Sequence, residues 1–432
     1  MDASKPATVV LGAGVVGLST ALYLQRSGHV VTVIDPMPPA GGASYGNSGL
    51  ISSDTAVPIA LPGMLQKVPG WLSDREGPLI VHPSYLPQAL PWLMRWIAAS
   101  RLSRVLQISD AMRKLHRGSL DCWREMLGPE HFADLIRPVG QIRIWEGEGA
   151  GSAIEAQICE RHGIRVEQLG ADELRQIYPE IAPDIKRGML IPGNAYTVSP
   201  QRLVRTLGRL VVEAGGSIVA ERTLKIIPRE GGGYRLMNNI SNRFAQRVVV
   251  ATGAWTRELL DPLGINVPLE TERGYHLMMP SPNITLKIPM SIKNRGFGLT
   301  PMEDGLRAGG TVEIGGLRAP PDERRAMVLM RHAKRVFPTL QTGEPTFWMG
   351  HRPSTPDSLP ILGEAPRLPG LFLAFGHGHF GMTGGPPSAR LVAQLITGDK
   401  PAFDPLPYSC SRFDSFAEPG REQPQGATAS LN

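Results

Sequence analysis

Residues 7–36, ATVVLGAGVVGLSTALYLQRSGHVVTVIDP, contain the pattern that decides the fold of this chain. A short run of β-branched residues is followed by closely spaced glycines, an amphipathic stretch that ends at Gly28, and a second apolar run, VVTVID. Strand, glycine turn, helix and strand in this order predict a βαβ unit.

Three glycines of this unit have the spacing GxGxxG, and each has a physical task. Gly12 permits a tight turn, Gly14 lets the backbone approach a pyrophosphate, and Gly17 lets the helix pack closely on the strand. Asp35 follows Gly17 by 18 residues, where a carboxylate accepts hydrogen bonds from an adenosine ribose. This acid, with no arginine after it in DPMPPAGG, favours NAD or FAD over NADP. We therefore predict a dinucleotide site rather than an ordinary glycine-rich turn.

The length and composition are typical of a globular protein with two or three domains. The chain has 432 residues, and its 49 glycines and 40 prolines imply many turns. The net charge of +6 comes from scattered lysines and arginines without an RNA-binding signature, so we expect no nucleic-acid partner. Three cysteines without a short spacing, and an N-terminus unlike a signal peptide, predict a cytoplasmic location. The polar, Pro/Gly-rich residues 414–432 predict a mobile tail.

Residues 57–106 are rich in proline, tryptophan and leucine, and their final part predicts an amphipathic helix with several arginines. Trp71, Trp92 and Trp96 fit either core packing or a surface that forms a lid or faces a membrane. Helical patterns continue to about residue 181, whereas residues 262–344 read as the strands of an antiparallel sheet. A second domain is therefore predicted to be inserted into the first.

Two later segments carry glycine next to apolar strands. In RVVVATGAWT, residues 247–256, Ala251 and Gly253 let the backbone pass close to a nucleotide, although an ordinary turn fits equally well. In LFLAFGHGHFGMTGG, residues 371–385, two histidines supply only two metal ligands, with no Asp, Glu or Cys beside them. We therefore predict no metal site. A polar or proton-handling role and a structural role both stay open for His377 and His379.

Four motifs together closely resemble the FAD-dependent D-amino-acid oxidase superfamily, and specifically its bacterial D-amino-acid dehydrogenase branch. They are GAGVVGLSTALYLQRSGHVVTVID, ASYGNSGLIS, VVVATGAW and HRPSTPDSLPILGEAPRLPGLFLAFGHGHFGMTGG. The resemblance implies an α/β fold in which a doubly wound, Rossmann-like FAD-binding domain carries an inserted antiparallel-sheet substrate domain. The implied FAD-binding domain is residues 1–57, 190–261 and 345–413, and the implied substrate domain is residues 58–189 and 262–344.

The resemblance also implies how FAD is held. No cysteine occurs in the motifs where related sarcosine oxidases attach flavin covalently, so we expect noncovalent FAD. Pro36 and Met37 stand where the family often has an arginine, which affects the contacts to adenosine. Residues 384–387, GGPP, are expected to precede a helix that ends at Gly398 and directs its positive N-terminus at the flavin. The residues expected around FAD are Gly12, Ala13, Gly14, Val15, Val16, Gly17, Asp35, Ser44, Asn47, Ser48, Gly49, Ala251, Gly253, Gly378, His379, Gly381, Met382 and Thr383.

An enzyme of this class anchors the carboxylate of an amino acid and holds its amine neutral while hydride passes from Cα to flavin N5. Arg352 in HRPSTPD is the expected carboxylate clamp, because a guanidinium grips both oxygens, and a salt bridge to Asp357 is the alternative. Tyr275 in RGYHLMM is the second substrate candidate, or a plain sheet tyrosine. His351 and Thr383 complete the predicted catalytic set.

The leading hypothesis from the resemblance is an FAD-dependent D-amino-acid dehydrogenase of amino-acid catabolism. D-proline and hydroxy-D-proline are among the substrates considered, and a quinone or another carrier is the expected electron acceptor. An oxygen-using oxidase of the glycine or sarcosine type and a nonenzymatic dinucleotide-binding regulator are the alternatives. The Trp- and Arg-rich residues 71–104 are expected to touch the inner face of the cell membrane.

Overall fold

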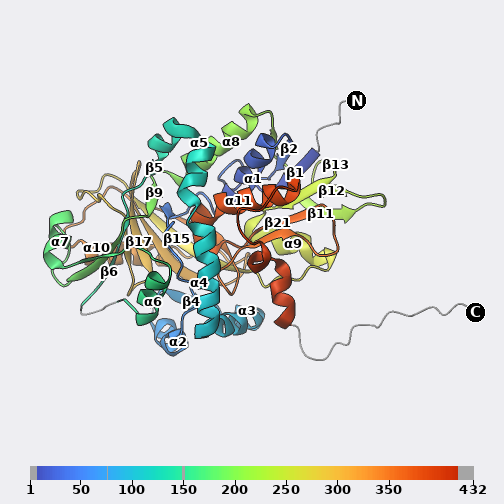
Figure 1. The fold of residues 1–432 in the computed structure, drawn as a ribbon. Helices are drawn as coiled ribbons and strands as arrows, with labels where there is room; N and C mark the ends of the chain where they lie inside the picture. Colours follow the sequence, from blue (N-terminus) through green and yellow to red (C-terminus); the bar gives the residue numbers. More distant parts are fainter. Residues whose placement is uncertain (1–6, 75, 148–150, 417–432) are drawn as a thin grey trace, which may run out of the picture.

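The computed structural model describes residues 7–74, 76–147 and 151–416, and Figure 1 shows its two large sheets with helices around them. The tail predicted at 414–432 lies outside the described residues from 417 onward. Within the described part, Cys410–Phe416 forms a 3₁₀ helix.

A six-stranded sheet contains the predicted βαβ unit at its centre. Its first five strands are parallel, and β20 is antiparallel to β21. Val10, Val33 and Val249 are completely buried, because both faces of this sheet are covered. In spatial order the strands are β10 (Ser217–Val219), β2 (Val30–Ile34), β1 (Ala7–Leu11), β14 (Arg247–Val250), β21 (Leu371–Phe375) and β20 (Ile361–Glu364).

Helices form the layer on one face of this sheet, and a small sheet lies on the other. The helices that share the core of the first face are α1 (Val15–Arg26), α8 (Pro200–Glu213), α11 (Gly381–Thr397), α4 (Leu102–His116) and α5 (Ser119–Leu135). The second face packs against α9 (Thr256–Leu260) and the antiparallel strands β11 (Thr223–Pro228), β12 (Tyr234–Asn238) and β13 (Asn242–Ala245). This arrangement confirms the predicted doubly wound α/β class.

The second large sheet has nine strands and is mostly antiparallel, with two parallel pairings, β16 with β6 and β18 with β4. Its order is β19 (Thr346–Ser354), β15 (Glu270–Met279), β18 (Gly305–Ile314), β17 (Phe297–Met302), β16 (Met290–Ile292), β6 (Gln141–Trp145), β8 (Arg187–Ile191) and β7 (Glu167–Leu169), with β4 (Leu79–Val81) beside β18. Helix α10 (Glu323–Val336) packs on one face through a separate hydrophobic core.

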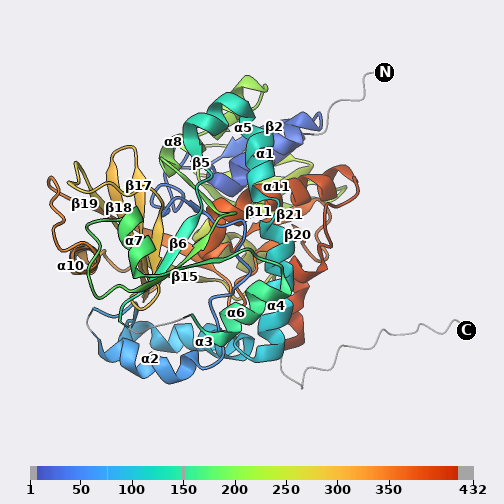
Figure 2. The same ribbon diagram turned by 60° about the vertical axis from the view of Figure 1, so that its left-hand side comes forward.

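The remaining elements join and flank the two sheets. Strands β3 (Leu50–Ile51), β9 (Ala195–Thr197) and β5 (Ile136–Arg137) form a three-stranded sheet. Helices α2 (Met64–Ser73) and α3 (Leu86–Ala99) lie together at the base of the molecule in Figures 1 and 2. Two further α-helices among the described residues are α6 (Ala153–Arg161) and α7 (Ala171–Ile177).

The sheet memberships bear on the predicted division of the chain. All six strands of the first sheet fall inside the three segments proposed for the FAD-binding domain. Strand β19 is different, because it pairs with β15 in the second sheet, so we propose a domain boundary after Ser354 instead of at 345. Helices α4 and α5, proposed for the substrate domain, pack on α11 instead.

Candidate active site

One large cavity lies between the two sheets. Its volume is about 1450 Å³. Its wall is formed by residues at the ends of β1 and β2, directly after β14, on strands of the second sheet and at the start of α11. Every predicted site residue lines this cavity except Gly17 and Gly49. Predicted site residues between positions 12 and 383 of the sequence therefore line the same cavity.

The GxGxxG turn has the geometry that its glycines predict. Gly12 has φ +112°, and a Cβ there would lie 2.4 Å from the carbonyl oxygen of Ala251. A Cβ on Gly17 would lie 1.9 Å from the carbonyl oxygen of Gly12, so this glycine serves packing and does not face the cavity. A Cβ on Gly14 would meet only Ser44 Oγ, at 3.3 Å. The turn thus leaves open space beside Gly14 at the N-terminus of α1, which fits a phosphate group.

Asp35 both lines the cavity and holds the turn in place. Its Oδ2 accepts a hydrogen bond from the Ala13 N–H at 2.7 Å, and its Oδ1 accepts one from the Met37 N–H at 2.8 Å. Burial raises the pKa of this carboxyl, although the two backbone donors oppose the shift. The Val15 N–H donates to Ser44 Oγ at 3.0 Å, so the predicted serine also meets the start of α1.

The second sheet supports the loop at residues 44–49. Buried Arg307 donates to the carbonyl oxygens of Tyr45 at 3.2 Å and Asn47 at 2.8 Å. Gly49 has φ +78°, and its N–H donates to Asn47 Oδ1 at 2.8 Å, so it shapes the loop without lining the cavity. Ser48 lines the cavity next to Asn47. Arg307 carries no sequence signal beyond its place in a strand.

Helix α11 begins at Gly381, earlier than the GGPP segment predicts, so both prolines lie inside it. Pro386 has no N–H for the carbonyl of Met382, and Trp123 Nε1 donates to that carbonyl instead, at 3.0 Å. Thr383 Oγ1 accepts a hydrogen bond from the Ser52 N–H at 2.9 Å. The helix ends at Gly398, as predicted, with φ +78°.

The two histidines before α11 point to different partners. His377 Nε2 lies 2.9 Å from Ser388 Oγ, and burial, with a smaller effect of His116, lowers its pKa to about 3. His379 lines the cavity, and its Nε2 lies 2.6 Å from Glu272 Oε2. Among the described residues, no three His, Cys, Asp or Glu side chains are grouped to hold a metal ion.

Arg352 faces the cavity from β19. Its Nη1 donates to the carbonyl oxygen of Thr311 at 2.9 Å, and its Nη2 donates to that of Gly310 at 3.3 Å. The guanidinium lies over Gly274, where a Cβ would be 2.0 Å from Cζ. The alternative partner, Asp357, is instead bound by Arg412.

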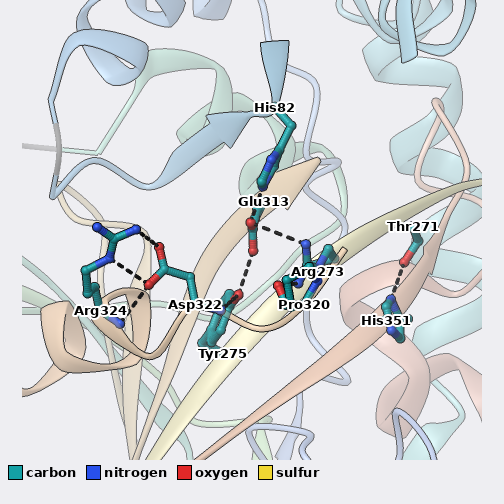
Figure 3. A network of polar contacts seen from close by, with 9 residues as sticks. All are labelled: His82, Thr271, Arg273, Tyr275, Glu313, Pro320, Asp322, Arg324 and His351. Atoms are coloured by element: carbon teal, nitrogen blue, oxygen red, sulfur yellow. Dashed lines mark hydrogen bonds and ion pairs between the residues drawn. The ribbon is translucent and has the colours of Figure 1, made fainter. Parts of the chain in front are cut away.

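The polar atoms of Tyr275 and His351 make contacts away from Arg352, and the catalytic roles predicted for these two residues stay predictions. The Tyr275 hydroxyl donates to Glu313 Oε2 at 2.7 Å and accepts from the Asp322 N–H at 2.9 Å (Figure 3). His351 Nδ1 lies 3.1 Å from Thr271 Oγ1. Successive residues of a strand point to opposite faces, so Gly274 under the guanidinium places Tyr275 on the α10 side of β15. Both residues line the cavity, but the Tyr275 hydroxyl does not reach Arg352.

Sequence reasoning missed a group of charged residues on β6, on α6 and directly after β16. Arg143 is buried and lines the cavity, and its Nη1 has no hydrogen-bond partner among the described residues. Nearby, Lys293 Nζ lies 2.8 Å from Glu155 Oε1, and both of these residues also line the cavity. Two cations and one carboxylate leave this wall with an excess positive charge. These residues come from separate segments, so no local motif identifies them.

Comparisons with known proteins cover nearly the whole chain. The family described as DAO, FAD dependent oxidoreductase, matches residues 7–395. The chain is 34% identical to a D-amino-acid oxidase from Bradyrhizobium diazoefficiens, over 94% of this chain and 98% of that protein. It is 30% identical to a D-amino acid dehydrogenase from Rhodopseudomonas palustris, over 95% of this chain and 98% of that protein.

Solved structures show the same fold at lower identity. The L-proline dehydrogenase from P. horikoshii superposes with a TM-score of 0.73 at 18% identity, over 95% of this chain and 98% of that one. The glycine oxidase from Geobacillus kaustophilus gives a TM-score of 0.69 at 23% identity, over 94% of this chain and 98% of that one.

Proposed function

Because this chain belongs to the DAO family of FAD-dependent oxidoreductases, we propose that it oxidises D-amino acids with noncovalently bound FAD. The observation that carries the proposal is Arg352, a guanidinium that faces the cavity near the start of α11 and has no carboxylate within hydrogen-bonding distance among the described residues. A planar guanidinium suits the carboxylate of an amino acid. None of the three cysteines lines the cavity, in keeping with noncovalent FAD.

The cavity supports a division of roles among the protein groups. FAD supplies the two-electron acceptor when it is bound. The open turn at Gly14 and the N-terminus of α1 would hold its pyrophosphate, Asp35 would meet its ribose, and the start of α11 would lie at its ring. Arg352 would then orient the substrate through its carboxylate, which fixes the direction of the Cα–H bond.

A panel of D- and L-amino acids tests the proposed function. Purified enzyme is assayed with an artificial electron acceptor and, separately, with oxygen alone. We expect oxidation of D-amino acids only, with D-proline and hydroxy-D-proline among the substrates, and little peroxide. Peroxide in proportion to the substrate consumed would favour the oxidase alternative, and no oxidation of any D-amino acid would contradict the proposal.

The exposed side of α2 and α3 supports the proposed membrane contact. Leu65, Leu72, Leu86, Leu90 and Met94 are all exposed on these two helices, which lie side by side in Figures 1 and 2, and all five also line the cavity. Trp92 is instead buried, and its Nε1 donates to the Ser354 carbonyl at 3.0 Å, so that tryptophan belongs to the core. No helix in the described residues has the length and hydropathy needed to cross a membrane.

Vesicle sedimentation tests this contact. We expect the enzyme to sediment with vesicles that contain anionic lipid, because apolar area and positive charge act together in such binding. Leu90→Asp combined with Met94→Asp should abolish sedimentation, whereas Phe244→Asp, at an exposed apolar residue on β13, should not. If the wild type stays in the supernatant, or if both variants behave alike, residues 71–104 do not form the contact.

A further inference from the structure

Glu272 and Arg352 are direct neighbours on the cavity face of the second sheet. They are paired in register on the antiparallel strands β15 and β19, and both line the cavity. Side chains paired in this way have Cβ atoms about 5 Å apart. The amine and the carboxylate of an amino acid sit on the same carbon, so a group that serves the amine must lie next to the carboxylate clamp.

Glu272 is held by His379 from the loop before α11. Residue Glu272 is only 5% exposed, and its Oε2 lies 2.6 Å from His379 Nε2. Burial raises the pKa of Glu272, but His379 and Arg352 outweigh this effect and hold it below its usual value. An ionised carboxylate only accepts hydrogen bonds, so His379 Nε2 carries the proton of this contact. Its other ring nitrogen, Nδ1, has no hydrogen-bond partner in the described part of the chain.

We propose that His379 is the base that takes a proton from the ammonium group of the amino-acid substrate, with Glu272 as its positioning residue. In this step an N–H bond of the ammonium breaks, its electron pair stays on nitrogen, and the proton forms a bond to His379 Nδ1. Glu272 holds the Nε2–H, fixes the tautomer and stabilises the resulting imidazolium. The neutral amine then has the lone pair that oxidation at Cα requires. This inference rests on the proposed function.

The surroundings of His379 favour this role. The charged groups that face it are Glu272 on β15 and, beyond it, Arg352 on β19. His377, two residues before His379, is turned to Ser388. A second carboxylate–histidine pair, buried Glu313 with partly exposed His82, lies on the side of the sheet where Tyr275 points, and neither residue lines the cavity. This second pair provides a matched control in the same protein.

The test compares His379→Gln and Glu272→Gln with Glu313→Gln in holoenzyme. His379→Gln keeps a donor for Glu272 but cannot accept a proton. We expect it to lower kcat/KM about a hundredfold or more at pH 7, with most of the loss recovered at high pH, where the substrate amine is already neutral. Glu272→Gln should move the low-pH limb of the profile to lower pH, because the imidazolium loses its carboxylate partner. Glu313→Gln should leave the shape of the profile unchanged.

Binding measurements separate this role from a structural tie between the loop and β15. Flavin content and the Kd of 2-furoate, a carboxylate without a basic amine, should match the wild type in His379→Gln, because glutamine keeps a donor for Glu272. The Kd of 2-furoate is followed by the change in flavin absorbance. A loss of the same factor at every pH, or an equal effect of Glu313→Gln, would overturn the proposal. An inactive wild type would instead contradict the proposed function itself.

Discussion

Arg352→Ala is expected to lower kcat/KM for D-amino acids by about 30-fold to several thousandfold while FAD stays bound. The reason is the loss of a charge-assisted, bidentate hydrogen bond to the substrate carboxylate, which corresponds to about 2–5 kcal/mol of transition-state binding. The guanidinium is free for this contact because its described hydrogen bonds go only to the carbonyl oxygens of Thr311 and Gly310. Steady-state kinetics on an amino acid and on the matching carboxylate-free amine measure the effect.

Two further variants separate geometry from charge at this position. Arg352→Lys keeps the charge but loses the planar fork, so it should restore little activity. Gly274→Ala keeps Arg352 itself but places a Cβ within 2.0 Å of its Cζ, so the guanidinium has to move. We expect both to weaken use of the amino acid more than use of the amine. Equal losses on the two substrates in all three variants would show that Arg352 has a structural role only.

The glycine positions were predictable from sequence because they depend on local backbone geometry. Gly12 has the positive φ of a tight turn, and Gly17 has no room for a Cβ, as the GxGxxG spacing requires. Gly398 ends its helix for the same kind of local reason. The predicted start of α11 was wrong, because the true start depends on a distant residue. Trp123 satisfies the carbonyl that Pro386 leaves without a donor, and no rule about prolines in helices contains that information.

The cavity side chains of the second sheet were harder to predict because strand pairing decides which face they occupy. Tyr275 and His351 stand in suggestive motifs, yet their polar atoms contact Glu313 and Thr271. Glu272 lies on the cavity face of the sheet with Arg352. Side chains alternate between the two faces of a strand, so Glu272 shares the face of Gly274 and could have been identified once the pairing of β15 with β19 was known. The position of Arg143 at the cavity depends on the long-range pairing of β6 with β16.

Gly14→Val is expected to weaken FAD binding by at least about ten- to a hundredfold, so that the purified protein loses its yellow colour. A branched side chain at this position lies where the turn must approach the pyrophosphate, and each lost hydrogen bond to a charged phosphate contributes about 1.5–3 kcal/mol. The apo fold should tolerate the change, because a Cβ on Gly14 meets only Ser44 Oγ and the backbone has an ordinary extended conformation. The flavin-to-protein absorbance ratio after gel filtration measures the loss.

Gly17→Ala is the control that separates a cofactor effect from a folding effect. Its Cβ would lie 1.9 Å from the carbonyl oxygen of Gly12, so this variant should lower the Tm of the apoprotein by displacing α1 from β1. Gly14→Val should leave the apo Tm within a few degrees of the wild type and remove only the stabilisation that FAD adds. Because the two glycines belong to one turn, opposite results on apo stability would assign Gly14 to the phosphates and Gly17 to the fold. Full retention of FAD by Gly14→Val would show that the pyrophosphate lies elsewhere in the cavity.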